Sequence, residues 1–398
     1  MNQFQLKAKR RLLNLKLKRL YYFVFIALFA CTEPTSPEFE FESGLIYVDA
    51  FISDIPGSSF VTIAESIFEF GFFRNEFIAN AQVVLRDVAS GREITLAEED
   101  ESYIPASDFT VAPGEVWELQ IELEDGRQYQ SLPEAVSDPV PINAVDATYN
   151  PELVFDIEED RFVPGHALTV TFDDPTDEDN FYLWRFRSFE RLVICAVCEN
   201  GVFREGQCLS FDEFRNRFGI GIDESAAEPQ YTYTCASECW QIRFNETIEI
   251  FSDEFSNGAL GNRLAVADVL LYTKNDILVE LEQYALTAEG HRYFRILKDI
   301  VDNNGNFNAP PPAALLGNMF NPNDSDEFVL GRFTIALAAS ASIFIDRTNI
   351  PEAALEAIPV NSESSDLFFG DGLQVLSTIP CEEGRFRTGT PPEGWISN

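Results

Sequence analysis

The feature that most restricts the fold is a series of short segments of alternating apolar and polar residues over residues 44–137. Segments such as "GLIYVDAFIS", "AQVVLRDV" and "VWELQIEL" place every second side chain on one face, as half-buried strands do. Ser90-Gly91 and Asp125-Gly126 lie where hairpin turns would join neighbouring segments. Short strands at this spacing predict an N-terminal β-sandwich domain of immunoglobulin or transthyretin type.

The Pro-rich stretch "SLPEAVSDPVPIN" predicts a domain boundary, after which a larger β-rich domain covers residues 142–398. Within this domain, a cysteine-bearing excursion spans residues 194–240. The segment "TAEGHRYFRILKDIVDNN" has apolar residues at helical spacing and predicts one amphipathic helix over about 287–302, with Thr287 as its N-cap. The 36 Phe and 2 Met favour strands over helices elsewhere. We therefore expect a mostly β protein.

The first 43 residues predict where the protein is found. Seven Lys and Arg residues precede an apolar run of eleven residues, which is too short to span a bilayer and is typical of a signal peptide over residues 1–30. The sequence "LFAC" resembles a bacterial lipobox, in which Cys31 would be acylated and would anchor the mature chain. Residues 31–43 form an acidic tether that resembles the surface-export signal of Bacteroidota lipoproteins. We expect a lipid-anchored protein of the outer membrane, on its outer face.

The charge balance excludes one class of partner. Removal of residues 1–30 leaves 21 basic against 66 acidic residues, a formal charge of −45. Phosphates of a nucleic acid would be repelled by such a chain. The same negative charge disfavours peripheral binding to anionic lipid, so attachment to the outer membrane would depend on the acyl chains.

A family resemblance covers nearly the whole mature chain. Residues 277–346 combine "YALTAEGHRYFRIL", a Pro-rich connection, "GNMFNPNDSDEFVLGRFTIA" and "SIFID", and Cys239-Trp240 and the lipobox precede them. This combination resembles the Bacteroidota lipoprotein family of the domain of unknown function 4249. The resemblance implies an outer-membrane lipoprotein, often encoded beside a TonB-dependent transporter, and it implies no catalytic residues. The family often has a close cysteine pair near its C-terminus, where this chain has only Cys381.

Six cysteines besides Cys31 are candidates for disulfides or for a structural zinc site. They are Cys195, Cys198, Cys208, Cys235, Cys239 and Cys381. The CxxC and CxxxC spacings fit four thiolates around zinc, but an exported protein favours disulfides. Five cysteines lie in the excursion, so full oxidation within one chain requires Cys381 to join one of them. The connectivity is one of about 15 possibilities, which the sequence leaves open.

Other polar patterns carry no specific chemistry. The acidic runs at residues 173–180 and 321–328 are interpreted first as solvated loops and second as calcium sites, because neither follows an EF-hand pattern. His166 and His291 lie in no catalytic motif, and the chain contains no nucleophile elbow or phosphate-binding loop. No cofactor or metal is indicated, and we expect no enzyme.

The stretch "IFEFGFFRNEF" at residues 67–77 carries five Phe in eleven residues. The favoured interpretation places them in the core, where alternate Phe side chains would line a sheet face. The adjacent positions of several Phe leave a second interpretation open, in which some face a partner or the bilayer surface.

These patterns lead to three functional hypotheses. The first is a non-enzymatic surface lipoprotein that serves as an accessory or ligand-capture partner of a TonB-dependent β-barrel transporter, with the ligand undefined. The second is a structural or adhesive cell-surface module that works without a transporter. The third, ranked last, is a secreted hydrolase with an unrecognised site.

Overall fold

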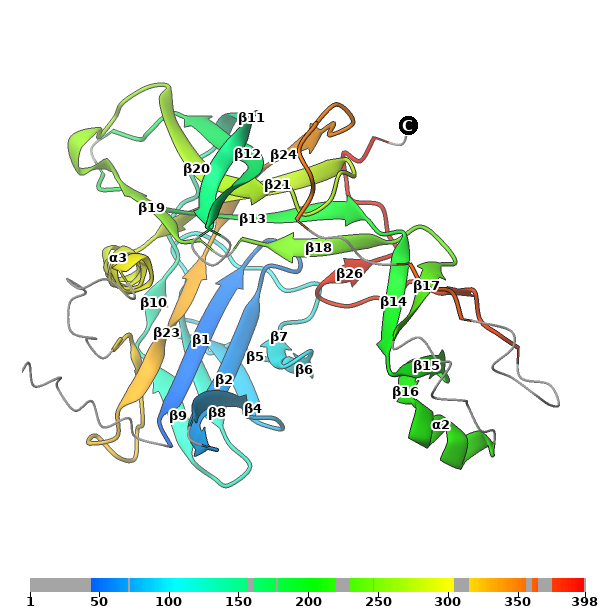
Figure 1. The fold of residues 1–398 in the computed structure, drawn as a ribbon. Coiled ribbons are helices and arrows are strands. Elements are labelled where there is room, and N and C mark those ends of the chain that lie inside the picture. Colours follow the sequence, from blue (N-terminus) through cyan, green and yellow to red (C-terminus); the bar gives the residue numbers. More distant parts are fainter. Residues whose placement is uncertain are drawn as a thin grey trace, which may run out of the picture. The chain divides into compact units, whose positions relative to one another are not determined.

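The computed structural model describes residues 44–70, 72–156, 160–176, 178–219, 230–245, 247–303, 315–355, 360–363 and 374–396 (Figure 1). The predicted signal peptide, tether and Cys31 lie outside these residues. The mostly β fold that the sequence predicted is confirmed. Across the described part of the chain, every helix is too short or too polar to cross a bilayer.

Two sheets pack face to face as a β-sandwich around one apolar core. The first sheet has the order β23-β1-β2-β7-β6, with β3 paired to β2. Its strands are β1 (Ile46–Ser53), β2 (Phe60–Glu69), β3 (Phe72–Phe77), β6 (Ala97–Glu99), β7 (Ser102–Ile104) and β23 (Val329–Ala336). The second sheet has the order β22-β9-β8-β4-β5, with β10 paired to β8. Its strands are β4 (Gln82–Asp87), β5 (Glu93–Thr95), β8 (Val116–Glu122), β9 (Gln128–Ser131), β10 (Glu134–Ala135) and β22 (Met319–Phe320).

The sandwich takes strands from both sides of the predicted boundary. β1 pairs in parallel with β23, from Ile46 opposite Val329 to Ser53 opposite Ala336. The close approach depends on Gly331, because a Cβ atom there would lie 2.0 Å from the carbonyl oxygen of Val48. Residues Gly44–Asn398 accordingly form one unit.

A second pair of sheets follows. A three-stranded sheet holds β11 (Ile142–Asp156), β12 (Arg161–Phe172) and β20 (Asn262–Leu270). The other has the order β24-β21-β13-β18-β26, with β19 paired to β13. Its strands are β13 (Phe181–Arg191), β18 (Trp240–Phe244), β19 (Glu249–Ser252), β21 (Ile277–Leu286), β24 (Ala338–Ile345) and β26 (Arg387–Thr388). Side chains of both sheets, such as Phe172 and Trp184, share one buried cluster.

The cysteine-bearing excursion folds around its own small core. Its elements are β14 (Ile194–Glu199), β15 (Gly201–Arg204), β16 (Gln207–Ser210), α2 (Phe211–Phe218), β17 (Gln230–Cys235) and β25 (Thr378–Ile379). The helix α2 was not predicted. It begins with a capping box, in which the Ser210 hydroxyl accepts from the Glu213 amide and the Glu213 carboxylate accepts from the Ser210 amide.

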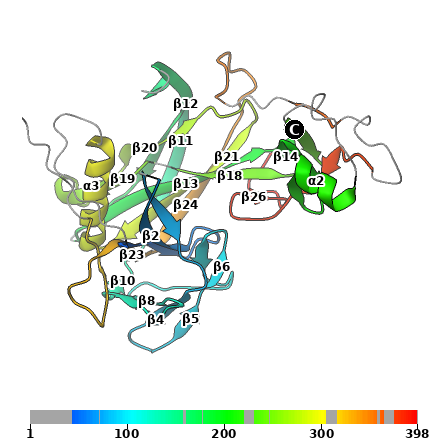
Figure 2. The same cartoon turned by 60° about the horizontal axis from the view of Figure 1, so that its bottom comes forward.

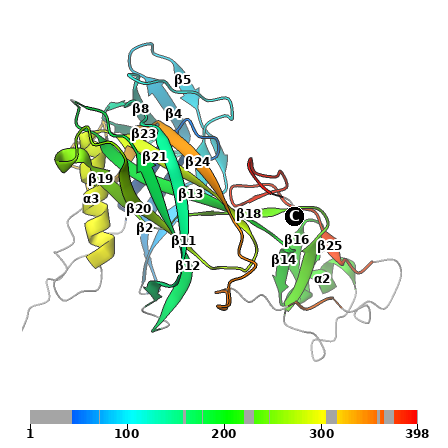
Figure 3. The same ribbon diagram turned by 90° about the horizontal axis from the view of Figure 1, so that it is seen from above.

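The predicted amphipathic helix is α3 (Ala288–Asn303). Thr287 acts as its N-cap, since its Oγ1 accepts from the Gly290 amide at 3.1 Å. Tyr293 and Phe294 pack against Phe51 of β1. Figure 2 shows α3 beside β19, and Figure 3 shows it on the opposite side from α2 and the excursion. A single turn of 3₁₀ helix, η1 (Asp253–Phe255), follows β19.

Candidate functional site

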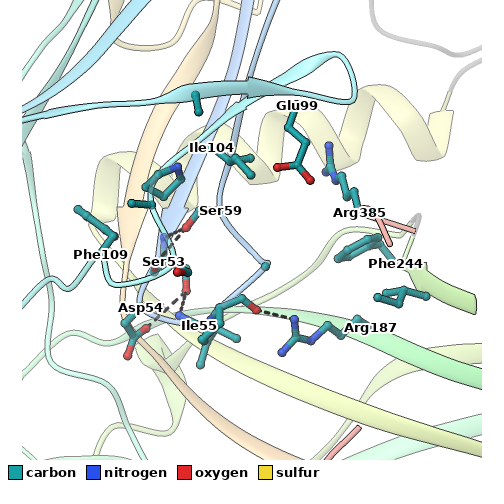
Figure 4. A pocket seen from close by; sticks show the side chains of 18 of the residues that line it. Ser53, Asp54, Ile55, Ser59, Glu99, Ile104, Phe109, Arg187, Phe244 and Arg385 are labelled. Carbon is teal, nitrogen blue, oxygen red and sulfur yellow. Dashed lines mark hydrogen bonds between the residues drawn. The ribbon is translucent and has the colours of Figure 1, made fainter. Parts of the chain in front are cut away.

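A cavity of about 520 Å³ lies where the sandwich meets the sheet that contains β13 and β18. Its volume is in the range of small-molecule sites. The sandwich contributes the β1–β2 loop, β5, β6 and the segment after β7, while the other wall comes from β13, β18 and a segment before β26 (Figure 4). The apolar lining is Ile55, Pro56, Ala97, Ile104, Pro105, Ala106, Phe109, Ile242 and Phe244, and the charged lining is Asp54, Glu99, Arg187 and Arg385.

Hydrogen bonds fix the conformation of the β1–β2 loop, which lines the cavity. The Ser53 amide donates to Ser59 Oγ, and that hydroxyl donates to the Ser53 carbonyl, both at 3.0 Å. The Ile55 amide donates to Ser53 Oγ at 3.0 Å. Gly57 takes a φ of +80°, a conformation that favours glycine. These serine hydroxyls therefore hold the loop in shape.

Two contacts join this loop to the opposite sheet, an exposed one through Arg187 and a buried one through Ser58. Arg187 of β13 donates from Nη1 to the Pro56 carbonyl and from Nε to Glu280 of β21, both at 2.5 Å. Ser58 donates its hydroxyl to Glu282 at 2.6 Å. Burial raises the pKa of Glu282, while hydrogen bonds from Ser58 and Tyr284 act in the opposite direction. Hydrogen bonds between polar groups therefore connect the two walls of the cavity.

Arg385 supplies a cation at the other side of the cavity. Its guanidinium lies 4.7 Å from the ring centroid of Phe60 and 5.5 Å from that of Phe244, within the range of cation–π contacts. It also donates to the Ser102 hydroxyl at 2.9 Å. Burial lowers the pKa of Arg385, and the Arg185 charge lowers it further, against the opposing charges of Asp49 and Asp100. A half-buried cation of this kind favours an anionic or strongly accepting group on a ligand.

The segment that carries Arg385 is attached at several points. β26 pairs with β18, with Trp240 opposite Thr388. Arg387 donates to the Cys195 carbonyl at 2.8 Å. A disulfide joins Cys381 to Cys239, the residue before β18. The C-terminal segment is therefore held against the excursion and completes one wall of the cavity.

The structure pairs all six cysteines of the excursion and tail. The disulfides are Cys195–Cys235, Cys198–Cys208 and Cys239–Cys381. The sulfur atoms of Cys195, Cys235 and Cys239 lie within 4.8 Å of one another. Two disulfides are thus neighbours, and a zinc site would require both to be reduced.

The histidines do not belong to the cavity lining. His166 lies in β12, where burial and the Arg347 charge lower its pKa to about 4. His291 lies in α3, and its ring centroid is 5.0 Å from that of Phe181. Both histidines are buried.

Carboxylates in the two acidic runs bind neighbouring loops. Asp173 accepts from the Gly261 amide at 2.6 Å, and Asp174 accepts from the Gly258 amide at 3.0 Å and from the Tyr182 hydroxyl. Glu327 accepts from the Tyr129 hydroxyl at 2.8 Å. These acids fix turns within the protein.

Sequence patterns did not single out the cavity residues. Arg187 lies beside Arg185 in an ordinary strand and Arg385 beside Arg387 in the tail, and neither belongs to a recognised motif. The odd number of cysteines in the excursion was the only signal that the tail returns to it. No spacing rule connects that tail with the β1–β2 loop.

Comparison with known families matches residues 32–342 to the family described as Domain of unknown function (DUF4249). A search of the curated proteins found no match. The family match covers well over half of the chain, and it ends before Cys381 and Arg385. The segment that completes the cavity therefore lies outside the matched range. The match confirms the resemblance found in the sequence, and the chain belongs to the DUF4249 family.

Proposed function

We propose that the protein is a non-enzymatic, lipid-anchored protein of the outer-membrane surface that captures a small ligand for a TonB-dependent transporter. The cavity beside Arg385 is the observation that carries the proposal. Its volume of about 520 Å³ suits a small organic molecule. Its lining combines an apolar wall with the half-buried guanidinium groups of Arg187 and Arg385 and the carboxylates of Asp54 and Glu99, which suits an amphiphilic ligand with a polar or charged group.

The anchoring part of the proposal is supported by the sequence alone. The basic and apolar residues 1–30, Cys31 and the acidic tether follow the order of a bacterial lipoprotein signal. Two or three acyl chains give stable attachment where one chain binds reversibly. A transporter would be the route by which a captured ligand crosses the outer membrane.

A single purification tests both the capture of a small ligand and the partnership with a transporter. The natively lipidated protein is isolated from mildly solubilised outer membranes, and its protein partners and released small molecules are identified by mass spectrometry. We expect a stoichiometric β-barrel and an amphiphilic compound. Recovery of the lipoprotein alone, under conditions that preserve a known transporter complex, would contradict the partnership and favour the structural or adhesive module.

A matched pair of variants tests the cavity itself. Ala106→Trp places a large side chain in the lining, whereas Ala89→Trp places one at an exposed turn remote from the lining. We expect the first variant to lose the released compound and the second to retain it. Equal retention by both folded variants would show that the compound binds elsewhere.

A further inference from the structure

The tip of the β2–β3 hairpin exposes three aromatic side chains. The exposed fractions are 57% for Phe68, 90% for Phe70 and 77% for Phe72. The favoured expectation that this stretch lies in the core is wrong for these three residues. Phe77, at the other end of β3, does pack against the sandwich core, with its ring centroid 5.6 Å from that of Tyr103. Clustered exposed aromatics mark a surface that contacts something apolar.

The hairpin extends beyond the rest of its sheet. β1 pairs with β2 only as far as Ile46 opposite Glu65. The pairing of β2 with β3 continues beyond that point to Glu69 opposite Phe72. Phe70 at the turn has a φ of +53°, an unfavourable conformation for a bulky residue. Such a conformation at an exposed turn is a feature that a contact function would explain.

The chain enters the described fold at the base of this hairpin. The Gly44 amide donates to the Ser66 carbonyl at 2.7 Å, and the Ser66 amide donates to the Leu45 carbonyl at 2.9 Å. β1 points upward in Figure 1, so Ile46 lies at its lower end. The thirteen residue steps from Cys31 to Gly44 span at most about 45 Å. Lipid attached at Cys31 would therefore keep Gly44 within about 45 Å of the bilayer, which leaves this end of the fold free to reach it.

We propose that the tip of the β2–β3 hairpin inserts Phe68, Phe70 and Phe72 into the interface of the bilayer to which Cys31 is anchored. This inference rests on the lipid anchor of the proposed function. Arg74 pairs with Glu69 at 2.9 Å and lies 3.8 Å from Glu76, so the tip offers no excess of positive charge to anionic headgroups. The contact is apolar, and together with the tether it gives the protein a fixed orientation at the surface.

Depth-dependent quenching tests the insertion. The natively lipidated protein is reconstituted into vesicles of phosphatidylcholine with brominated acyl chains, as the variants Phe70→Trp and Phe255→Trp. Phe255 is the matched control, because it is 94% exposed and follows β19, whose residue Ile250 packs near Phe51 at the opposite end of β1. We expect the fluorescence that Phe70→Trp adds to be quenched at least twofold and shifted to the blue, and that of Phe255→Trp to be unaffected.

Three results would overturn the inference, and they are distinguishable. If the two variants are quenched equally while the protein is anchored, the hairpin tip does not insert, and the lipid anchor is unaffected by this result. If the mass of the N-terminal peptide shows no acylation at Cys31, both the lipid anchor and the insertion of the hairpin tip are contradicted. If a photocrosslinker in place of Phe70 forms adducts with an outer-membrane protein and none with lipid, the tip is a protein-docking surface instead.

Discussion

At the scale of single residues, Arg347 is among the most enclosed charges of the described fold. Its side chain is 0% exposed, and Nη1 donates to Glu190 of β13 at 2.5 Å. Burial lowers the pKa of Arg347, while the Glu190 charge raises it. Arg347→Met would remove the closest ion-pair partner of the buried Glu190 carboxylate, which also has Arg243 at 3.7 Å. We expect the free energy of unfolding to fall by about 3–5 kcal/mol in urea titrations.

The matched control for this prediction is Arg263→Met. Arg263 pairs with Asp146 at 3.3 Å, but the two side chains are 63% and 56% exposed. Because water and salt screen such a pair, its loss should cost less than about 1 kcal/mol. Equal destabilisation by both variants would show that burial does not determine the strength of these pairs.

His166 gives the protein a specific acid sensitivity. Its pKa in the folded state is about 4, below the value near 6.5 of an unfolded chain. The unfolded state therefore binds the proton more readily, and the stability contributed by neutral His166 is complete above pH 6.5 and is lost as the pH falls toward 4. His166→Phe should reduce the loss of stability between pH 7 and 4.5 by roughly 2 kcal/mol.

Two measurements check the histidine prediction. Urea unfolding at both pH values compares the variant with the parent. Since the chain has two histidines, their ring proton resonances can also be followed by NMR, and one should titrate near pH 4. An equal fall in stability in both proteins, or a resonance that titrates near pH 6.5 for His166, would contradict the prediction.

At the scale of elements, the tail depends on a disulfide that closes a long loop. Cys239 and Cys381 are 142 residues apart in sequence. Replacement of both by alanine should lower stability by about 5 kcal/mol in the chain-entropy model, since long loops gain most from closure. It should also release the segment around Arg385 and Arg387, so that trypsin cuts there before the rest of the fold.

The control for the tail is the pair Cys198 and Cys208, which are 10 residues apart. The same model gives about 3 kcal/mol for their removal. Trypsin should then leave Arg385 and Arg387 protected, because the tail keeps its own disulfide. Early cleavage at these arginines in both variants would mean that the excursion as a whole, rather than one bond, holds the tail.

The elements that the sequence predicted are those with local patterns. The helix α3 was predicted because its apolar face and N-cap lie within one short segment. The helix α2 was missed although its capping box at Ser210 and Glu213 was a readable signal, since eight residues give little periodicity. The pairing of β1 with β23 had no signal, because alternation reveals a strand but not its partner.

The candidate site was harder to predict than the fold for the same reason. The odd count of cysteines indicated that Cys381 joins the excursion, but spacing could not select Cys239 among five. The cavity forms only when the β1–β2 loop, β13 and the tail come together. Arg385, one of two arginines in the lining, could be assigned to the cavity only from the tertiary structure.

At the scale of the whole molecule, the dominant physical property is an excess of negative charge. The full chain carries a formal charge of −38, and the chain after residue 30 carries −45. Such an excess keeps a protein soluble but destabilises its compact state through self-repulsion. The ion pairs inside the fold act in the opposite direction, and the strongest of them are buried, as at Arg347 and Glu190.

This balance predicts that added salt stabilises the protein. Salt screens repulsion between exposed acids more than attraction within buried pairs, because a Debye length of about 10 Å at 0.1 M falls to about 3 Å at 1 M. We expect the thermal midpoint to rise by about 2–5 °C between 20 and 500 mM NaCl, with KCl giving the same result. Calcium chloride at equal ionic strength is the informative comparison. An equal rise assigns the effect to screening, a larger rise adds calcium sites at acidic loops such as residues 321–328, and a fall with NaCl would mean that exposed ion pairs outweigh the repulsion.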